Sequence, residues 1–466
     1  KLDVLDITFR NEFSICHYLV PQGYPNHKLS ENQITLNLDQ HPHQNLMFYS
    51  ALEKGDSGNH YLKNSRTLAL VQTGSNLQNC IDSSMKILGS IQAPLVFRSD
   101  IGSQYGNQNP YLSSGVNVEE GDLVIDKIKA SVEKTFDPYV FNNFGDFGGV
   151  YDIGGKIKSW NYQNPLLVSS TDGVGTKTKL VLQILGEKKG LHSLGQDIVN
   201  HSVNDILVKG ARPLFFLDYV ASSVIRAGDI QSLLEGISQS CCQNGVSILG
   251  GETAEMPGVY QESCYDIVGT IVGLVDKDNM IDGKRDIKEG DLVFGILSDG
   301  PHTNGYSLIR KILDPIIQEQ LRDRDIREIQ LGCVSILDFL KPHRSYLEEV
   351  LLLQKLNVRF KALCHITGGG YQGNIPRVLP EGLGVNLQVP ILEPFATLQK
   401  LGQMSNEDMY RIFNCGYGML VFVKPDDRDT INKNCFFHEL GKVNRVEEND
   451  NQVVVLQNRV LSNTHR

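Results

Sequence analysis

The sequence has few of the features that mark zinc-binding, disulfide-rich or nucleic-acid-binding proteins. Its nine cysteines contain no Cys-x-x-Cys pair, so neither a zinc site nor a disulfide framework is indicated. Acidic residues outnumber basic ones by 54 to 44, and no cluster of lysine and arginine offsets this balance, which argues against nucleic-acid binding. No apolar run approaches the roughly 18 residues of a membrane span, and the N-terminus has no signal-peptide core. We therefore expect a cytoplasmic protein that binds neither membranes nor nucleic acid.

Length and composition predict several globular units. A chain of 466 residues that is 41% hydrophobic and 21% charged should form about three domains of typical size. Short alternating runs predict a small α+β lobe, followed by a stretch of linker composition and then by apolar strands that alternate with amphipathic helices, which indicates α/β or α+β layers. The expected boundaries are 1–102 for the small lobe, 103–110 for the linker, and 111–280 and 281–466 for two further lobes. Because Lys1 falls within a strand-like run, we expect the chain to be part of a longer polypeptide.

A glycine-rich loop follows the apolar run LLVSS. The segment TDGVGTKTKL, residues 171–180, supplies what a phosphate site needs: glycines that let backbone N–H groups come close, hydroxyls, lysines, and an acid that can hold a metal ion. It is neither a Walker A loop nor a G-x-G-x-x-G fingerprint, because Thr176 and Thr178 stand where those motifs need glycine. An ordinary tight turn is the alternative. The residues predicted to face ATP are Asp172, Gly173, Gly175, Thr176 and Lys177, with Lys179 as the other candidate cation.

The next segment, residues 190–210, has apolar residues at helical spacing and a polar stripe beside them. Asp197, His201, Asn204 and Asp205 fall at positions i, i+4, i+7 and i+8, and so share one side of the helix. A solvated face is the alternative, but such a face usually carries Lys and Glu rather than short carboxylates, an amide and an imidazole. Those groups suit Mg²⁺ and polar substrates.

A third carboxylate, Glu252, follows the strand-like run at 246–249. Open α/β sheets place their ligands just beyond such strand ends. We therefore predict that Asp172, Asp205 and Glu252 converge on Mg²⁺ bound to a nucleotide.

Two later segments repeat the order strand, glycine-rich loop, helix. An anion fits the N-terminus of a helix that follows such a loop, so the three loops together predict a site for two phosphorylated compounds. The residues concerned are His302, Thr303, Asn304 and Gly305 in one loop and His365, Thr367, Gly368, Gly369 and Gly370 in the other. His192 and His343 lie outside glycine-rich loops, and we interpret them as structural.

These segments are similar to the aminoimidazole ribonucleotide synthetase family, also called phosphoribosylformylglycinamidine cyclo-ligase, of de novo purine synthesis. The matching blocks, in the family's order, are TDGVGTKTKL, VNDILVKGARPLFFLDYVA, GGETAEMPGVY, SDGPHTNGYSLIRKIL, HITGGGYQGNIPRVLPEGLG and MYRIFNCGYGM. The resemblance implies a homodimeric enzyme with two lobes per chain, the N-terminal lobes pairing their sheets. It also implies the reaction: formylglycinamidine ribonucleotide and ATP give aminoimidazole ribonucleotide, ADP and phosphate.

The first hundred residues resemble a different family, the C-terminal lobe of glycinamide ribonucleotide synthetase. CHYLVPQGYP and FRSDIG mark the two ends of this similarity. In eukaryotes the two activities are fused in this order, so the resemblance implies the back part of a bifunctional protein that also joins phosphoribosylamine to glycine. The ATP-grasp segment of that protein would precede Lys1 and act as its partner.

The resemblance assigns the nucleotide to the first of the two large lobes. Asp172, Asp205 and Glu252 would hold Mg²⁺ and ATP, under a loop that contains Gly145 and Gly148. The loop departs from the family pattern, because NNFGDFGGV has polar residues where glycines are usual, and we expect an altered nucleotide affinity. Further polar residues stand where apolar or small ones are usual in the helix. The substituted positions are Asn142, Asn143 and Asp146 in the loop and Gln196, Asn200 and His201 in the helix.

The resemblance assigns the ribonucleotide and its phosphate to the second large lobe. The loops that begin at His302 and His365 would hold this substrate, and either histidine could move a proton at neutral pH. Lys129, in the segment DKIKASVEK, would lie near the reacting groups. A solvated helix lysine is the alternative for that residue.

Two other functions remain open on the sequence alone. One is a different ATP-dependent kinase or synthetase of the same superfamily, acting on thiamin phosphate or selenide. The GGETAEMPG block and the lack of a reactive cysteine near the first glycine loop count against it. The other is a catalytically degenerate dimer that organises purine enzymes, for which the substituted loop at 142–149 is the support.

Overall fold

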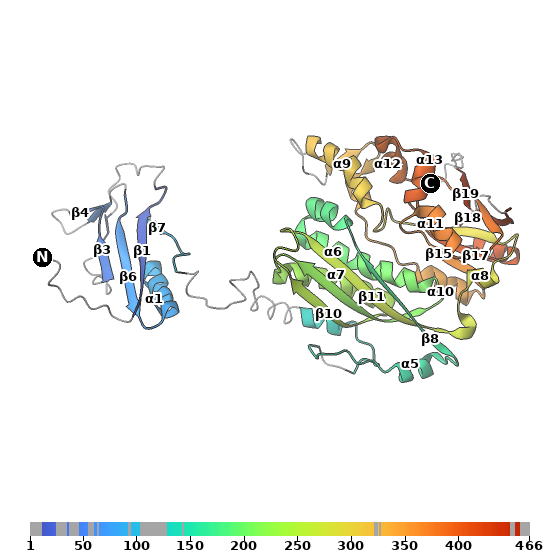
Figure 1. Ribbon diagram of the computed structural model, residues 1–466, viewed down its shortest axis with the longest axis horizontal. Helices are drawn as coiled ribbons and strands as arrows, with labels where there is room; N and C mark the ends of the chain where they lie inside the picture. The colour runs from blue at the N-terminus through green and yellow to red at the C-terminus, as the bar shows by residue number, and fades with distance from the viewer. Residues whose placement is uncertain are drawn as a thin grey trace. The chain divides into compact units, whose positions relative to one another are not determined.

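The computed structural model forms two compact units, Lys1–Val116 and Asn117–Arg466 (Figure 1). The structure describes residues 12–24, 35–36, 46–54, 60–62, 65–91, 95–102, 128–141, 144–320, 325, 328–447 and 453–456. No helix in this described part of the chain is both long enough and apolar enough to span a membrane.

In its described residues the first unit has a four-stranded antiparallel sheet and the helix α1 (Leu77–Ser90). Along β1 every second side chain is buried, because a strand with one covered face turns alternate residues toward its core. Asn76 caps α1, its side chain accepting a hydrogen bond from the backbone of Asn79. The sheet order is β3-β6-β1-β7, with β1 (Phe13–Pro21), β3 (Met47–Tyr49), β6 (Leu68–Gly74) and β7 (Leu95–Phe97), and a second sheet joins β2 (Thr35–Leu36), β5 (His60–Leu62) and β4 (Leu52–Lys54). The small α+β lobe predicted from the sequence is confirmed.

The second unit begins with a four-stranded sheet of order β10-β9-β11-β8, in which β9 and β10 are parallel and β11 is antiparallel to both β8 and β9. Two long helices, α6 and α7, pack on one face of this sheet. Phe216 on β9 is fully buried, whereas Leu167 on β8 is 61% exposed. The elements are α5 (Ile153–Trp160), β8 (Pro165–Gly173), α6 (Lys177–Leu207), β9 (Arg212–Ser222), α7 (Ala227–Asn244), β10 (Ser247–Glu255) and β11 (Tyr265–Asp276).

The rest of the second unit is built on a six-stranded sheet of order β15-β17-β12-β18-β16-β19, antiparallel except for the pair β16 and β19. Its strand β17, between β15 and β12, is buried along its whole length. The strands of this sheet are β12 (Leu292–Leu297), β15 (Ala362–His365), β16 (Leu383–Gln388), β17 (Tyr417–Val423), β18 (Phe437–Arg445) and β19 (Val453–Leu456), while the short strands β13 (Gln330–Leu331) and β14 (Val334–Ser335) form a separate antiparallel pair. The helices are α8 (Gly283–Asp286), α9 (Tyr306–Gln320), α10 (Leu347–Lys355), α11 (Gly370–Asn374), α12 (Phe395–Gly402), α13 (Asn406–Ile412) and α14 (Arg428–Asn432), with 3₁₀ turns η2 (Lys277–Asn279), η4 (Ile336–Phe339), η5 (Ile375–Arg377) and η6 (Pro425–Asp427).

The two sheets of the second unit share one core. Buried apolar side chains from both form a single continuous cluster, which runs from α6 and β9 to β17 and β18. The mixed α/β and α+β fold with two lobes is therefore confirmed. The lobe boundaries stay predictions, and the linker at 103–110 lies outside the described residues.

Candidate functional site

The polar stripe on α6 is buried and faces the second lobe. Asn200 donates a side-chain hydrogen bond to the carbonyl of His343 at 2.7 Å, and Asn204 donates one to the carbonyl of Arg344 at 2.7 Å. Asn204 also accepts from the backbone N–H of Tyr346 at 2.9 Å. A solvated face is thus the wrong interpretation, and Asn204 holds the segment at 343–346 in place.

Lys177, predicted to neutralise phosphate, points into the core instead. Its ammonium group donates to Asp197 Oδ1 at 2.7 Å and to the carbonyl of Lys341 at 2.8 Å, and both side chains of the ion pair are fully buried. The same carboxylate oxygen accepts from the backbone N–H of His343 at 2.6 Å. The phosphate assignment of Lys177 is therefore wrong, because its charge is already matched inside the protein.

Two of the three predicted metal carboxylates meet beside His201. His201 Nε2 lies 3.0 Å from Asp172 Oδ2 and 3.6 Å from Asp205 Oδ2. Burial lowers the pKa of His201, but the two carboxylates outweigh burial and raise it above its usual value. Asp172 is half exposed, and contact with His201 lowers the pKa of its carboxyl group. Asp172, His201 and Asp205 therefore form a cluster in which two carboxylates surround one imidazole and Asp172 is open to solvent; we call this cluster the acidic pocket.

Glu252 does not join this pocket within one chain. It pairs with Tyr219 on β9, Tyr219 pairs with Val268 on β11, and Val268 pairs with Gly173 on β8. Three strand spacings, about 14 Å, thus separate Glu252 from the end of β8. Within one chain Glu252 therefore lies apart from Asp172 and Asp205, because β8 and β10 are the opposite edges of the sheet. The convergence of the three carboxylates on one Mg²⁺ stays a prediction.

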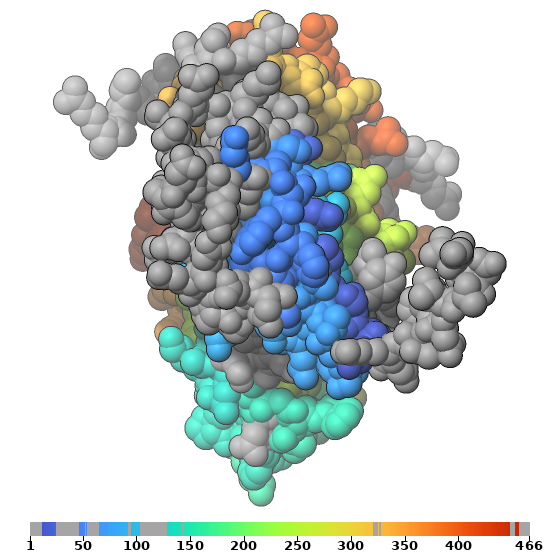
Figure 2. Space-filling model, turned by 90° about the vertical axis from the view of Figure 1, so that its left-hand side faces the viewer, coloured from blue at the N-terminus to red at the C-terminus, as the bar shows by residue number. Residues whose placement is uncertain are grey.

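The glycine loop at 144–149 lies near that far edge. A side chain added at Gly149 would meet Leu249 on β10, while Gly145 and Gly148 have open space around them. Most of this segment is exposed, and the teal spheres of this part of the chain lie at the surface in Figure 2. Asn142 and Asn143 lie outside the described residues. Lys129 is 57% exposed and 4.0 Å from Glu133, the arrangement expected of a solvated helix lysine.

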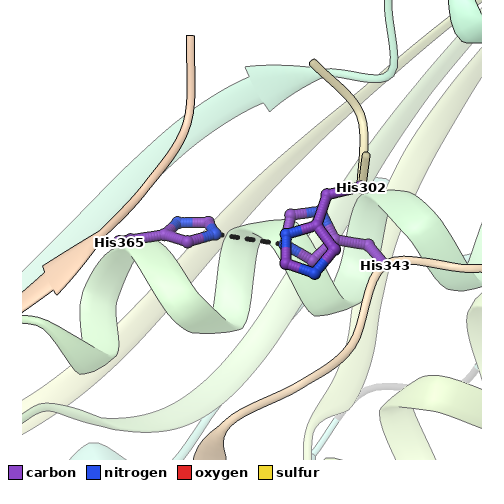
Figure 3. Close-up of side chains that lie close together, drawn as sticks. All are labelled: His302, His343 and His365. Carbon is purple, nitrogen blue, oxygen red and sulfur yellow. Dashed lines mark hydrogen bonds between the residues drawn. The ribbon is translucent and has the colours of Figure 1, made fainter. Parts of the chain in front are cut away.

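Four histidines gather where the lobes meet. His343 Nε2 lies 3.1 Å from His365 Nε2, and the rings of His302 and His343 stack with centroids 3.9 Å apart (Figure 3). His365 Nδ1 in turn lies 3.0 Å from Asp205 Oδ1. Burial lowers the pKa of His302, His343 and His365, so these imidazoles are neutral at pH 7.

Sequence reasoning missed His343 because it follows a proline in KPHRSY and has no glycine loop. The hydrogen bonds of Asn200 and Asp197 to its backbone bring it into the site. These contacts join residues more than a hundred positions apart, and no local pattern reports them.

The two later glycine loops line one cavity of about 580 Å³. Its walls include Gly305, Gly368 and Gly369, together with Arg411, a cation that sequence reasoning did not assign. Gly305 and Gly370 have positive φ angles of 77° and 58°, and a Cβ at Gly370 would lie 2.1 Å from the carbonyl oxygen of Tyr410. The structure thus brings together a cavity of glycine backbone and one guanidinium, a pairing that suits a phosphate group.

The remaining predicted residues precede the cavity's glycines in the two loops: Thr303 and Asn304 come before Gly305, and Thr367 comes before Gly368. Thr303 Oγ1 lies 2.7 Å from His201 Nδ1 and 3.4 Å from His343 Nδ1. Thr367 donates to Asn374, which in turn holds the glycine turn through the carbonyl of Gly370 at 2.8 Å. The amide nitrogen of Asn304 is buried and has no hydrogen-bond partner among the described residues, as expected of a group that waits for a ligand.

Comparison with known protein families assigns the domains of the chain to a class. The AIR synthase related protein N-terminal domain matches residues 149–275, and the corresponding C-terminal domain matches 288–453. The phosphoribosylglycinamide synthetase C domain matches 14–104.

Relatives that match over most of their own length identify the family within this class. Phosphoribosylformylglycinamidine cyclo-ligase of Methylobacillus flagellatus is 42% identical over 330 residues, 69% of this chain and 89% of that protein. The protein of the same name from Lactococcus lactis is 39% identical over 354 residues, 75% of this chain and 99% of its own. This chain belongs to the phosphoribosylformylglycinamidine cyclo-ligase family.

The fold is also similar to that of solved structures. The hydrogenase maturation protein HypE in complex with ATP matches with a TM-score of 0.50 at 14% identity, over 72% of this chain and 92% of that protein. At this identity the similarity concerns the fold alone.

Proposed function

We propose that the second unit catalyses the ATP-dependent ring closure of formylglycinamidine ribonucleotide to aminoimidazole ribonucleotide. The observation that carries the proposal is the hydrogen bond from His365 to Asp205. Asp205 belongs to the acidic pocket of the first lobe, and His365 begins the glycine-rich loop that lines the cavity of the second lobe. Because the chain belongs to the cyclo-ligase family, the reaction that we assign to this pair of sites is the one for which the family is named. Ring closure needs a phosphate donor beside a ribonucleotide, and the contact of His365 with Asp205 supports such an arrangement.

Mg²⁺–ATP fits the acidic pocket. Asp172 and Asp205 present carboxylate oxygens of the kind Mg²⁺ binds, and the half exposure of Asp172 leaves room for a nucleotide. Mg²⁺ would neutralise the charge that builds up on the transferred phosphate. Gly173, Gly175 and Thr176 would offer backbone N–H groups and a hydroxyl to the phosphates.

The ribonucleotide fits the cavity of the second lobe. Its phosphate would lie among Gly305, Gly368 and Gly369, with the guanidinium group of Arg411 as counter-charge. Asn304 would use its unpaired amide for the substrate. This placement directs the formyl group toward His365 and the acidic pocket.

The reaction needs two changes at the formyl carbon. Transfer of the γ-phosphate to the formyl oxygen turns that oxygen into a leaving group, and an amidine-side nitrogen then attacks the carbon as phosphate departs. The attacking nitrogen loses one proton. Neutral His365 or His302 accepts it, and the hydrogen bond from His365 Nδ1 to Asp205 orients that imidazole and stabilises its charged form.

A second copy of the chain would complete the nucleotide site. Glu252 and the loop at 144–149 belong to the β10 edge of the sheet, whereas Asp172 lies on β8 at the other edge. If two sheets pair edge to edge, β10 of one copy borders β8 of the other. We therefore propose a homodimer in which Glu252 of one copy lies at the nucleotide site that Asp172 and Asp205 form in the other copy.

The first unit would serve a neighbouring step of the same synthesis. Residues 14–104 match the C domain of phosphoribosylglycinamide synthetase, so we propose that an ATP-grasp segment of the same parent polypeptide is its partner. The parent protein would then join phosphoribosylamine to glycine. Both reactions use small water-soluble ribonucleotides, which fits a cytoplasmic enzyme.

Oxygen-18 in the formyl group tests the proposed reaction. Labelled formylglycinamidine ribonucleotide is incubated with the chain, ATP and Mg²⁺, and the released phosphate is analysed by mass spectrometry. One labelled oxygen per phosphate is expected, because the formyl oxygen leaves with the phosphate. Unlabelled phosphate would show that ATP is hydrolysed by water, and the degenerate-scaffold alternative would then take its place.

A further inference from the structure

Another cavity, of about 420 Å³, lies between α5, the start of β9, the end of α7 and α10. We call it the basic cavity. Arg212 in its wall pairs with Leu274 on β11, and Leu274 pairs with Leu167 on β8. Asp172 stands five residues further along β8, so about 17 Å of strand separates the level of Arg212 from the acidic pocket. The basic cavity also shares no lining residue with the glycine-lined cavity, so it is distinct from both sites of the proposed function.

The basic cavity has an excess of positive charge. Its lining contains three cations, Lys134, Lys156 and Arg212. Asp137 is the only carboxylate among the described residues that line it, and this carboxylate accepts from Lys156 Nζ at 2.6 Å and from the hydroxyl of Tyr151 at 2.8 Å. Neither Lys134 nor Arg212 forms an ion pair with a carboxylate in the part of the chain that the structure describes. Two cations are thus left for a ligand, in a chain whose net charge is −10.

An aromatic ring orients Arg212. The guanidinium carbon lies 4.2 Å from the centre of the Trp160 ring, and Lys156 Nζ lies 4.9 Å from the same centre. The N–H groups of a guanidinium point outward in its own plane, so contact with a ring face does not occupy them. The contact of Arg212 with the side chain of Tyr162 uses only part of its five donors. Arg212 can therefore present a hydrogen-bonding edge to a phosphate.

The remaining walls of the basic cavity are largely apolar. Pro213, Cys241, Val246 and Leu347 are buried residues that line it. Sites for small organic ligands combine such apolar surface with a few charged groups and have volumes of about 300–1,000 Å³. Two unpaired cations beside an aromatic ring and apolar surface therefore suit an organic phosphate better than a bare inorganic ion.

A hydrogen-bond network joins the basic cavity to the segment at 343–346. Asn244, which lines the cavity, donates to Asn200 Oδ1 at 3.0 Å and accepts from the hydroxyl of Ser345 at 2.6 Å. Asn200 in turn donates to the carbonyl of His343, whose ring belongs to the histidine group at the junction of the lobes. A ligand that moves Asn244 would thus act on a segment that borders the active site.

We propose that the basic cavity is an effector site for a small organic phosphate of the size of a nucleoside monophosphate. The phosphate would bind Lys134 and Arg212, and the rest of the ligand would contact Trp160 and the apolar walls. Its binding would change the rate of ring closure through Asn244. The inference rests on the proposed function only for this effect on the rate, since binding is measured without catalysis.

The chain has a single tryptophan, Trp160, and it lines the basic cavity, so its fluorescence reports on binding there. The test is a titration of the chain with AMP in the presence of EDTA. A saturable change in fluorescence is expected. Arg212→Met and Lys134→Met should each weaken AMP binding by about 10-fold or more, the equivalent of one charged hydrogen bond. Arg428→Met, which alters a surface arginine outside the cavity, should bind AMP as the wild type does.

Two further measurements separate the basic cavity from the active site. Asp205→Asn, in the acidic pocket, should keep its affinity for AMP. With ATP in excess, AMP should change the turnover of the wild type and have much less effect on that of Lys134→Met. The absence of a saturable change in fluorescence, equal affinity for AMP in the wild type and both cavity variants, or loss of AMP binding in Asp205→Asn would overturn the site. Binding of AMP without any change in turnover would overturn its role as an effector site.

Discussion

Lys177 and Asp197 form a fully buried ion pair, with 2.7 Å between Nζ and Oδ1. Lys177 is the first residue of α6, and its ammonium group also donates to the carbonyl of Lys341 in the second lobe. Lys177 thus connects the start of α6, which follows the glycine loop, to Asp197 further along the same helix and to Lys341 in the second lobe.

Removal of either partner of this pair should destabilise the second unit. Lys177→Met or Asp197→Asn leaves a buried charge without its counter-charge, which costs about 3–5 kcal/mol. Urea unfolding followed by tryptophan fluorescence measures the loss. The exposed neighbour Lys179 provides the control, since Lys179→Met should change stability by less than about 0.5 kcal/mol. A Lys177→Met variant as stable as that control would contradict the account.

The free energy of unfolding should decrease as pH rises, because of the carboxyl group of Asp218. This carboxyl group is buried on β9, and burial raises its pKa to about 7. The folded protein therefore binds a proton that the unfolded chain has lost, and stability decreases as pH rises from about 4 to about 7 and stays reduced above that. Asp218→Asn, which has no charge to bury, should be more stable than the wild type at pH 8 by up to about 4 kcal/mol.

Melting temperatures of both proteins at pH 5 and pH 8 check the effect of Asp218. The difference between the variant and the wild type should be larger at pH 8. The same substitution at the exposed Asp278 should give no such difference. An equal difference at both values of pH would show that Asp218 is ionised throughout.

Gly370 should tolerate no side chain. Its φ of +58° is strained for other residues, and an added Cβ would lie 2.1 Å from the carbonyl oxygen of Tyr410. Gly370→Ala should cost at least about 1–3 kcal/mol of stability and raise KM for the ribonucleotide. At Gly373, in the same helix, the nearest atom would be 3.9 Å away, and Gly373→Ala should leave stability unchanged.

Arg411 should govern affinity for the ribonucleotide. Arg411→Met removes the guanidinium group from the glycine-lined cavity, and KM for formylglycinamidine ribonucleotide should rise about 10- to 150-fold, the equivalent of one charged hydrogen bond. KM for ATP should not change. Arg428, which pairs with Glu439 on the surface, is the control: Arg428→Met should behave as the wild type. A rise in KM for ATP instead would contradict the assignment of the cavity.

The sequence predicted the lobes and the loops better than it predicted the partners of single side chains. Spacing placed Asp197, His201, Asn204 and Asp205 on one side of a helix, and they do lie there. Spacing does not say what that side faces: Asp197 and Asn204 hold the segment at 341–346, whereas His201 and Asp205 border the acidic pocket.

The order of the strands in the sheet was the other feature that local sequence patterns could not predict. Asp172 and Glu252 both follow apolar runs of the sequence and were expected at a ligand crevice beyond a strand end, but they lie inside β8 and β10. The observed order β10-β9-β11-β8 puts them at opposite edges. Strand order depends on contacts between distant segments, so the separation of these two carboxylates became visible only in the folded chain.

Turnover tests the central claim most directly. The chain is incubated with formylglycinamidine ribonucleotide, ATP and Mg²⁺, and phosphate and aminoimidazole ribonucleotide are measured together, with Asp205→Asn beside the exposed control Asp278→Asn. We predict equal amounts of both products from the wild type and the control, and neither from Asp205→Asn. Phosphate without aminoimidazole ribonucleotide, or full activity in Asp205→Asn, would contradict the cyclo-ligase assignment and the role of Asp205 within it.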